Sequence, residues 1–267
     1  MEEGKRTVPD RMLGCWKRRY IKFKNGDEDT ATRVIWLQTL SEMVDIRIPE
    51  RVLDFSRGHS LRDYSYEQLL ELAEQDCGNA ITTLDESSVP YATASWDSDE
   101  HDASIQSIVI FPEDGWFDWR EKGQCMMEWA PSGDYEEDWR LQADSRSYIA
   151  HYKNLNPEKS EFVFLTGEHA VFVKGRTELL NEERHLRDIV TDNRDNRAYL
   201  EALLDIEFSY ARRKQNNQFQ IELSSLPFRE GQFLELGYLL DMGLDEQKIT
   251  QPDNQDTWLR VCQWKQI

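Results

Sequence analysis

Asp45 and Arg47 stand two residues apart in a segment that alternates between polar and apolar residues. In an extended strand such residues share a face, with Cα atoms roughly 6.5–7 Å apart. If that face lines an enclosed space, Arg47 can grip a carboxylate or polar ligand, and Asp45 can orient the arginine or act as a base. If the alternate residues Val44, Ile46 and Ile48 face the core instead, the pair lies in solvent and contributes little to stability. The alternation is compatible with both arrangements.

Trp36 and Gln38 share a face of the preceding apolar segment. A neighbouring strand with this pattern would add a polar, aromatic wall to a pocket that contains Asp45 and Arg47. Arg176, which follows a later apolar segment, is a further expected ligand contact. The hypothesis is therefore a site of four ligand-binding residues, Arg47, Trp36, Gln38 and Arg176.

Two more side chains are candidates for proton transfer, together with Asp45. His169 lies between two apolar segments and would titrate near neutral pH at the lip of a cavity, although a hydrogen-bonded histidine in a turn fits the same pattern. Glu207 is flanked by apolar residues. On an inward face it would become a general acid or base, and on an outward face it is ordinary alternation.

Motifs for metal and nucleotide chemistry are absent from the sequence. The five histidines form no H-E-x-x-H pair, and the four cysteines have no metal-ligand spacing. The sequence also lacks G-x-S-x-G, G-x-x-x-x-G-K and G-x-G-x-x-G, which disfavours a serine hydrolase, a nucleoside triphosphatase and a dinucleotide-dependent dehydrogenase. We therefore expect neither a metal nor another cofactor.

The elements that would position these residues are mostly short strands, separated by Gly, Asp, Ser and Pro at intervals typical of an antiparallel sheet. A helix is predicted from Tyr64 to Ala73, with Ser65 as its N-cap and Gly78 as its stop. Two further helical segments are predicted over 181–191 and 196–204. The expected strands are 13–23, 30–40, 43–48, 80–84, 91–96, 104–111, 115–120, 124–129, 139–141, 148–153, 162–166, 170–176, 206–212, 219–226 and 258–264.

Composition narrows the class of protein. The 267 residues include nine Trp, ten Tyr and eleven Phe, enough large side chains for a substantial core. The net charge of −19 would repel phosphate backbones and anionic membranes, so neither nucleic acid nor a membrane is an expected partner. Sparse cysteines, no signal-like N-terminus and no apolar run of transmembrane length favour the cytoplasm.

Gly14-Cys15-Trp16, on the first predicted strand, resembles the Gly-x-Trp of the lipocalin-like, or calycin, superfamily. Four further segments extend the resemblance to a double-barrel variety of that group: Val34–Gln38, Asp45–Pro49, Tyr135–Trp139 and Ser225–Gly231. The resemblance implies a basic residue packed over the Trp16 ring, for which Arg260 and Arg176 are the candidates. It also implies a mainly β fold of antiparallel lipocalin-like β-barrels with a few short helices. Residues 12–131 would form the N-terminal barrel half and 135–267 the C-terminal half.

Three functions fit this fold. Lipocalin-like barrels hold small molecules, so the first is a binding protein for a small, largely apolar or amphipathic molecule. The second is a cofactor-independent cavity enzyme, an isomerase, cyclase or lyase, with Glu207, His169 and Asp45 as acid–base residues and Arg47 as an oxyanion contact. The third is a protein-interaction module whose barrels are filled by side chains.

Overall fold

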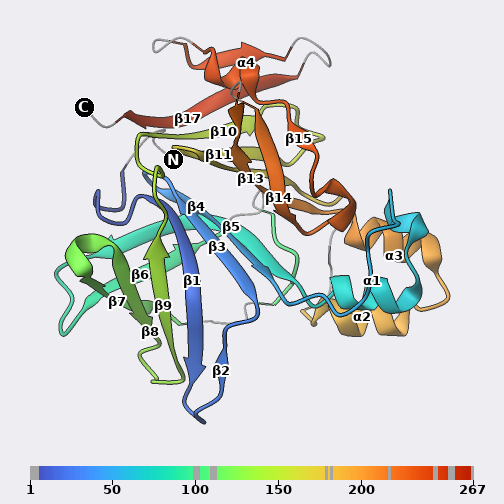
Figure 1. Cartoon of the computed structure of the whole chain (residues 1–267), viewed down its shortest axis with the longest axis horizontal. Coiled ribbons are helices and arrows are strands. Elements are labelled where there is room, and N and C mark those ends of the chain that lie inside the picture. The colour runs from blue at the N-terminus through green and yellow to red at the C-terminus, as the bar shows by residue number, and fades with distance from the viewer. Residues whose placement is uncertain are drawn as a thin grey trace.

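The computed structural model describes residues 6–98, 103–108, 113–177, 180, 183–215, 218–242, 246–251 and 256–265. Figure 1 shows two antiparallel sheets, one formed by the first half of the chain and one by the second, with a group of helices beside them. The predicted mainly β fold is confirmed. Among the described residues, none of the helices is long and apolar enough to cross a bilayer.

The first sheet closes on itself. Its strands follow each other in chain order except that β2 pairs only with β1, and the last strand, β9, returns to pair with β1 through Trp16–Leu141 to Phe23–Tyr135. The result is a closed eight-stranded barrel with β2 as an extra short strand. Its strands are β1 (Gly14–Phe23), β2 (Glu28–Asp29), β3 (Arg33–Gln38), β4 (Glu42–Ile48), β5 (Asp76–Asp85), β6 (Ala92–Asp97), β7 (Gly115–Arg120), β8 (Cys125–Trp129) and β9 (Tyr135–Leu141).

The second sheet has eight strands in the order β15-β14-β13-β12-β11-β10-β17-β16. In the described part of the chain, no pairing joins its two edge strands, so this sheet is open where a second barrel was expected. Its strands are β10 (Tyr148–Asn154), β11 (Glu161–Thr166), β12 (His169–Lys174), β13 (Glu207–Arg213), β14 (Phe219–Ser224), β15 (Phe233–Leu234), β16 (Lys248–Thr250) and β17 (Thr257–Lys265).

The expected boundary between 131 and 135 differs from the division between the two sheets. Strand β9 begins at Tyr135 and pairs with β8 and β1, so it completes the first barrel rather than opening the second half. The chain passes to the second sheet only after Leu141. Closure explains the difference, because the barrel needs a last strand to satisfy the free edge of β1.

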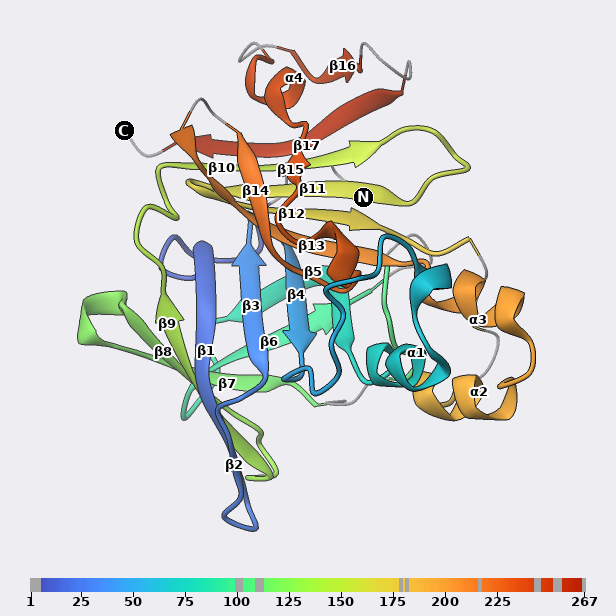
Figure 2. The same ribbon diagram turned by 45° about the vertical axis from the view of Figure 1, so that its right-hand side comes forward.

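Three of the four α-helices in the described part of the chain lie side by side at one flank of the molecule (Figure 2). They are α1 (Tyr66–Leu72), α2 (Leu186–Asp192) and α3 (Arg197–Leu204), and α4 (Gly237–Leu240) lies on the second sheet. Short 3-10 turns span Leu61–Asp63, Glu121–Gly123 and Pro227–Arg229. Ser65 caps α1 as predicted, since its side chain accepts from the Gln68 amide.

Two predictions about local structure near β5 are wrong. Gly78 does not end the helix, because β5 begins at Asp76 and Gly78 pairs there with Asp45. The strand expected over 104–111 is reduced to an isolated bridge between Ser104 and Gly78, and its residues 109–111 lie outside the described part. Segment 103–108 therefore lies along the start of β5.

The outer face of the barrel packs on the second sheet. Ile35, Leu37, Val44, Ile46 and Ile48 project outward from β3 and β4 into one hydrophobic core with residues of β11, β12 and β13, including Phe162, Phe164, Val171, Val173 and Phe208. The two sheets thus share a continuous core. This arrangement leaves the other face of β3 and β4 to line the inside of the barrel.

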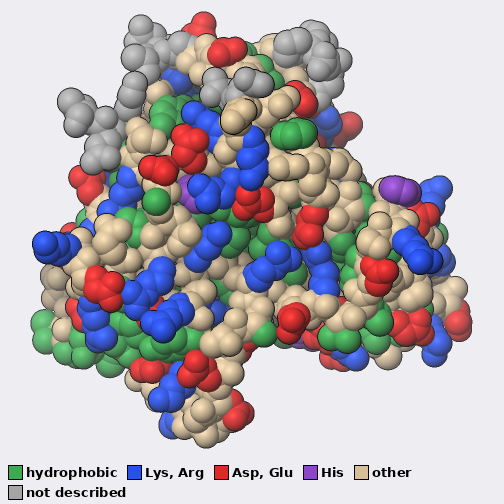
Figure 3. All heavy atoms as spheres, in the orientation of Figure 1, with side chains coloured by type: hydrophobic (Ala, Val, Ile, Leu, Met, Phe, Trp, Pro, Cys, Tyr) green, Lys and Arg blue, Asp and Glu red, His purple; other side chains and the backbone are tan. Residues whose placement is uncertain are grey.

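Charge is unevenly spread over the surface. On the face shown in Figure 3, Lys and Arg side chains gather across the middle, around β1 and the junction with the second sheet, although the chain carries a net charge of −19.

Candidate functional site

A cavity of about 1070 Å³ runs from the inside of the barrel to the second sheet. Its volume lies at the upper end of the roughly 300–1,000 Å³ of sites that hold small molecules. The barrel side is lined by Trp36, Met43, Asp45, Arg47, Asp76, Trp96, Glu128 and Tyr135. The far side is formed by segment 103–108 and by the ends of β10, β11 and β12, among them Lys153, Phe162 and Arg176. Both halves of the chain therefore contribute to it.

Strand register brings Asp45 and Arg47 to the inner face of the barrel. Trp36 is paired with Asp45, and Arg47 with Asp76, so the side chains of each pair lie on the same face. Nε of Arg47 donates to Oδ2 of Asp45 over 2.5 Å, and Nη1 donates to Oε1 of Glu137 over 3.2 Å. Of the two arrangements open to this pair, the structure adopts the inward one.

The ion pairs continue beyond Arg47. Oε1 of Glu137 also accepts from Nη1 of Arg18 at 2.7 Å, and Nη2 of Arg18 donates to Oδ2 of Asp29 at 2.9 Å. The chain of contacts therefore runs Asp29–Arg18–Glu137–Arg47–Asp45 across three strands and the short β2. Such a network fixes the position of Arg47, because each guanidinium is held by two carboxylates.

Burial shapes the acid–base behaviour of this network. It raises the pKa of Asp45 above its usual range, although the nearby Arg47 guanidinium lowers it. Burial alone would lower the pKa of Arg47, but Asp45 and Glu137 outweigh it and raise that pKa well above its usual value. Burial also raises the pKa of Asp76, which lines the same wall. Arg47 is therefore a permanent cation among carboxyl groups that resist ionisation.

Glu128 is the most strongly perturbed carboxyl group in the cavity wall. Its residue is 4% exposed, Oε2 accepts from the indole Nε1 of Trp139 at 2.9 Å, and Oε1 accepts from the Tyr135 hydroxyl at 3.3 Å. Burial first, and then the neighbouring Glu137, raise the pKa of Glu128 well above its usual range. A carboxyl group in this setting can hold a proton at neutral pH and donate it.

Aromatic rings form the apolar part of the wall. The ring of Trp36 meets those of Trp96, Phe117 and Trp139 edge to face, with centroids 6.2, 6.0 and 5.4 Å apart. Trp36 and Trp96 reach the cavity, whereas Phe117 and Trp139 pack behind them. The site thus combines flat apolar surfaces with carboxyl groups.

Gln38 holds Trp36 in place and does not line the cavity. Its Oε1 accepts from Trp36 Nε1 at 3.1 Å and from the Thr82 hydroxyl at 2.9 Å. Its amide nitrogen donates to backbone carbonyls at the turn between β3 and β4. Gln38, a predicted wall residue, therefore affects the cavity only through the orientation of the Trp36 indole.

Arg176 reaches the cavity from the second sheet, just beyond the end of β12. Its Nη2 donates to the carbonyl of Ile105 over 2.7 Å, while Nε has no hydrogen-bond partner among the described residues. Burial lowers the pKa of Arg176 to about 10. The residue is therefore placed as a cationic contact opposite the barrel wall.

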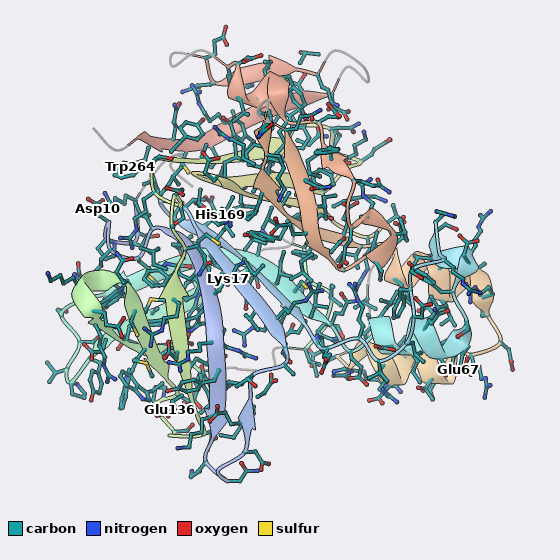
Figure 4. The ribbon with its side chains drawn as sticks, in the orientation of Figure 1. Asp10, Lys17, Glu67, Glu136, His169 and Trp264 are labelled. Atoms are coloured by element: carbon teal, nitrogen blue, oxygen red, sulfur yellow. The ribbon has the colours of Figure 1, made fainter. Side chains whose placement is uncertain are left out.

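His169 and Glu207 lie away from the cavity wall. His169 is completely buried at the junction of the two sheets, where Figure 4 shows it above Lys17 of β1. Its Nδ1 lies 2.8 Å from the Tyr210 hydroxyl and Nε2 lies 3.1 Å from the Ala143 carbonyl. Glu207 accepts from Ser209 Oγ at 2.6 Å and Arg229 Nε at 2.9 Å. Of the three predicted proton-transfer residues, only Asp45 reaches the site.

Burial lowers the pKa of His169 to about 4. The histidine is therefore neutral in the folded protein near pH 7, and both ring nitrogens are occupied by neighbours. Its position fits a structural role, with the imidazole linking β12 to β13 and to the segment that follows the barrel.

Sequence reasoning missed Glu128, Tyr135, Asp76 and Trp96. Alternation within the predicted strand 124–129 puts Glu128 on the same face as Met126, but the pattern does not show which face lines a barrel. Tyr135 and Glu137 reach the site only because β9 closes the barrel against β1. A signal was present in the run of acidic residues between aromatic ones over 135–139.

The Gly-x-Trp segment is held by an arginine that was not among the candidates. Cζ of Arg146 lies 5.6 Å from the centre of the Trp16 ring, and its Nε donates to the Leu13 carbonyl at 2.7 Å. Gly14 has a φ of 116°, and an added Cβ would lie 2.9 Å from Ser145 Oγ and 3.2 Å from Arg146 Cγ. Arg260 instead donates to the Glu246 carbonyl, and Arg176 lies at the cavity. The prediction placed this basic residue later in the chain, at Arg176 or Arg260, whereas Arg146 comes directly after the last strand of the barrel.

Within the described residues, no three His, Cys, Asp or Glu side chains are grouped closely enough to hold a metal ion. All four cysteines are free and buried. The site is accordingly made of ion pairs, carboxyl groups and aromatic rings.

Comparisons with known proteins define the fold and leave the activity open. No protein-family model matches the chain, and no curated protein matches it. The crystal structure of the uncharacterized protein YLR301w from Saccharomyces cerevisiae is similar, with a TM-score of 0.56 and 10% sequence identity. The similarity covers 94% of this chain and 98% of that one, so the whole two-sheet arrangement recurs.

Proposed function

We propose that this protein is a lipocalin-like binding protein that holds a small, largely apolar molecule with polar groups in the cavity described above. The observation that carries the proposal is the cavity of about 1070 Å³ with Trp36 and Trp96 in its wall. Flat rings supply contact area for an apolar body, and the few charged groups around them would fix its orientation.

The proposal can be tested with N-phenyl-1-naphthylamine, a neutral dye whose emission rises in apolar sites. Saturable binding with one site per chain is expected. Gly78→Leu should abolish it, because Gly78 lines the cavity and an added Cβ would have no neighbour closer than 3.6 Å, leaving room for the larger side chain to fill the space. Thr83→Leu, on the exposed side of the same strand, is the matched control and should bind as the unmodified protein does.

Two results would contradict this function. One is the absence of saturable binding by the unmodified protein. The other is equal affinity in Gly78→Leu and Thr83→Leu, each folded by far-UV circular dichroism, since the dye would then bind elsewhere.

A second function, acid–base catalysis in the same cavity, is favoured by one observation. Glu128 combines a raised pKa with a place in the cavity wall, which is how a general acid is held ready. An isomerase, cyclase or lyase would use it with Asp45 and Arg47. Mass spectrometry of small molecules released from the denatured protein, compared between the unmodified chain and Glu128→Gln, tests this idea. A catalytic role predicts product from the unmodified chain and substrate from the variant, and identical molecules from both would exclude it.

A further inference from the structure

We propose that the barrel end of the cavity selects a ligand with a cationic group, such as an organic ammonium ion, attached to an aromatic or other apolar body. This inference rests on the proposed binding function and names the class of ligand. It follows from the balance of charges in the wall, the position of the rings and the opposite polarity of the far side.

Carboxyl groups outnumber cations inside the barrel. Of the described residues that line the cavity there, Asp45, Asp76 and Glu128 are acidic and Arg47 alone is basic. Arg47 is already engaged by Asp45 and by Glu137, and Arg18 is divided between Glu137 and Asp29. Five carboxyl groups, those of Asp29, Asp45, Asp76, Glu128 and Glu137, thus surround two guanidinium groups.

The excess of carboxyl groups is partly neutralised by retained protons. Burial is the first cause of the raised pKa values of Glu128, Asp45 and Asp76, and the neighbouring Glu137 raises those of Glu128 and Asp45 further. The second oxygen of Asp45 has no hydrogen-bond partner among the described residues. A ligand cation would reduce the same repulsion and would be attracted where an anion is repelled.

The rings favour an organic cation. Trp36 and Trp96 stand in the same wall as the carboxyl groups, and indole faces attract ammonium groups as well as apolar surfaces. A bare metal ion fits poorly, because no three acidic, His or Cys side chains of the described part form a metal-binding group. A ligand can therefore contact both the carboxyl groups and the indole rings only if its positive charge and its apolar body belong to one molecule.

The far side of the cavity has the opposite charge. Lys153 and Arg176 line it and Glu158 opposes them, while Lys159, also in the lining, is paired with Asp256 at 2.5 Å. A cationic group would be repelled from this side and attracted to the barrel wall. The ligand would therefore enter with its charged group toward Asp76 and Glu128.

The test uses three naphthalene derivatives of nearly equal size: 1-naphthylmethylamine, 1-naphthalenemethanol and 1-naphthoic acid. Isothermal titration calorimetry at pH 7 and low salt should show the ammonium compound binding at least tenfold tighter than the alcohol, with the carboxylate weakest. Asp76→Asn removes one carboxylate from the barrel wall and should reduce that preference severalfold. Glu158→Gln removes one from the far side and is the matched control, which should keep or increase the preference.

The outcomes separate this inference from the proposed function. Equal binding of ammonium and alcohol, or tightest binding of the carboxylate, would overturn the cation preference while leaving a binding cavity in place. The cation preference is likewise wrong, and the binding cavity remains, if the three compounds fail to bind while the neutral dye still binds more weakly to Gly78→Leu than to Thr83→Leu. If neither the dye nor any naphthalene derivative binds, the binding function itself is wrong. Equal effects of Asp76→Asn and Glu158→Gln would show that the barrel wall does not select the cation.

Discussion

The two faces of β4 border two interiors of different character. On the outer face, Val44, Ile46 and Ile48 enter a dry core shared with the second sheet. On the inner face, Asp45 and Arg47 belong to a network of ion pairs beside a large cavity. A single strand with strict alternation thus serves as the common wall of both.

Ionisable groups are treated differently on the two sides. At the junction with the second sheet, the buried His169 is held neutral, with its pKa lowered to about 4. Inside the barrel, Arg47 is held charged by Asp45 and Glu137, and burial raises the pKa values of Asp45, Asp76 and Glu128. The junction thus disfavours a charge on this histidine, whereas the barrel interior stabilises the charge of Arg47.

The largest expected effect comes from breaking the ion pairs inside the barrel. Arg47→Ala removes the guanidinium that neutralises Asp45 and Glu137 and should lower the free energy of unfolding by about 3–5 kcal/mol. Chemical denaturation at pH 7 measures it. The chain offers a matched control in Asp118 and Arg120, which have the same spacing and a 3.0 Å contact but 42% and 52% side-chain exposure. Arg120→Ala should cost less than about 1 kcal/mol.

A comparable loss in Arg47→Ala and Arg120→Ala would remove the distinction between the inner face and the surface of the barrel. Partial recovery of Arg47→Ala at acid pH would support it, because protonation of Asp45 relieves the uncompensated charge that the variant leaves behind.

The next effect concerns His169, at the junction between the barrel and the second sheet. Since the folded pKa of His169 is about 4 and the unfolded value is 6.5, the neutral imidazole stabilises the fold fully above pH 6.5. That contribution is lost as the pH falls toward 4, and the difference amounts to roughly 3 kcal/mol. His169→Gln keeps a polar side chain beside Tyr210, and its free energy of unfolding should not show this part of the decrease at acid pH.

Denaturant titrations at pH 7, 5.5 and 4 measure the effect, with the exposed His59→Gln as control. The control should follow the unmodified protein at each pH. If His169→Gln also follows it, the imidazole is not held neutral by its surroundings, and the contrast between the two interiors fails at this residue.

Much of the fold could be predicted from the sequence, because alternation and turn residues report local structure. The strand 115–120 appears exactly as predicted, and Ser65 caps its helix. The direction of Asp45 and Arg47 could not be predicted in the same way. Alternation shows which residues of a strand share a face. In this barrel both faces of β4 are covered, so burial of the apolar face does not place the polar face in solvent.

The site residues were harder to predict because they depend on contacts between distant parts of the chain. Glu128 and Tyr135 face Asp45 only after β9 pairs with β1, more than a hundred positions away in the sequence. Arg146 covers Trp16 for the same reason, since the segment after β9 returns to the start of β1. His169 and Glu207 satisfied the local pattern of buried acid–base residues, but each found its partners in the second sheet.

The last of the stability effects should come from Glu128 and should have the opposite sign. Its folded pKa lies above the unfolded value of 4.5, so its contribution is full below pH 4.5 and is lost as the pH rises through the folded pKa. Glu128→Gln imitates the protonated form, and its amide oxygen can still accept from Trp139 Nε1. The variant should therefore match the unmodified protein near pH 4.5 and exceed it in stability at pH 8.

Glu136→Gln is the control on the other face of β9, and it should leave the pH dependence unchanged; Figure 4 labels this residue near the end of the barrel. Thermal melts across pH 4.5 to 8 measure both variants. A Glu128→Gln protein that loses stability at pH 8 would show that the carboxylate is held ionised inside the barrel. In that case the barrel wall would lack the retained proton, and its excess charge would have to be balanced by Arg47 and Arg18 alone.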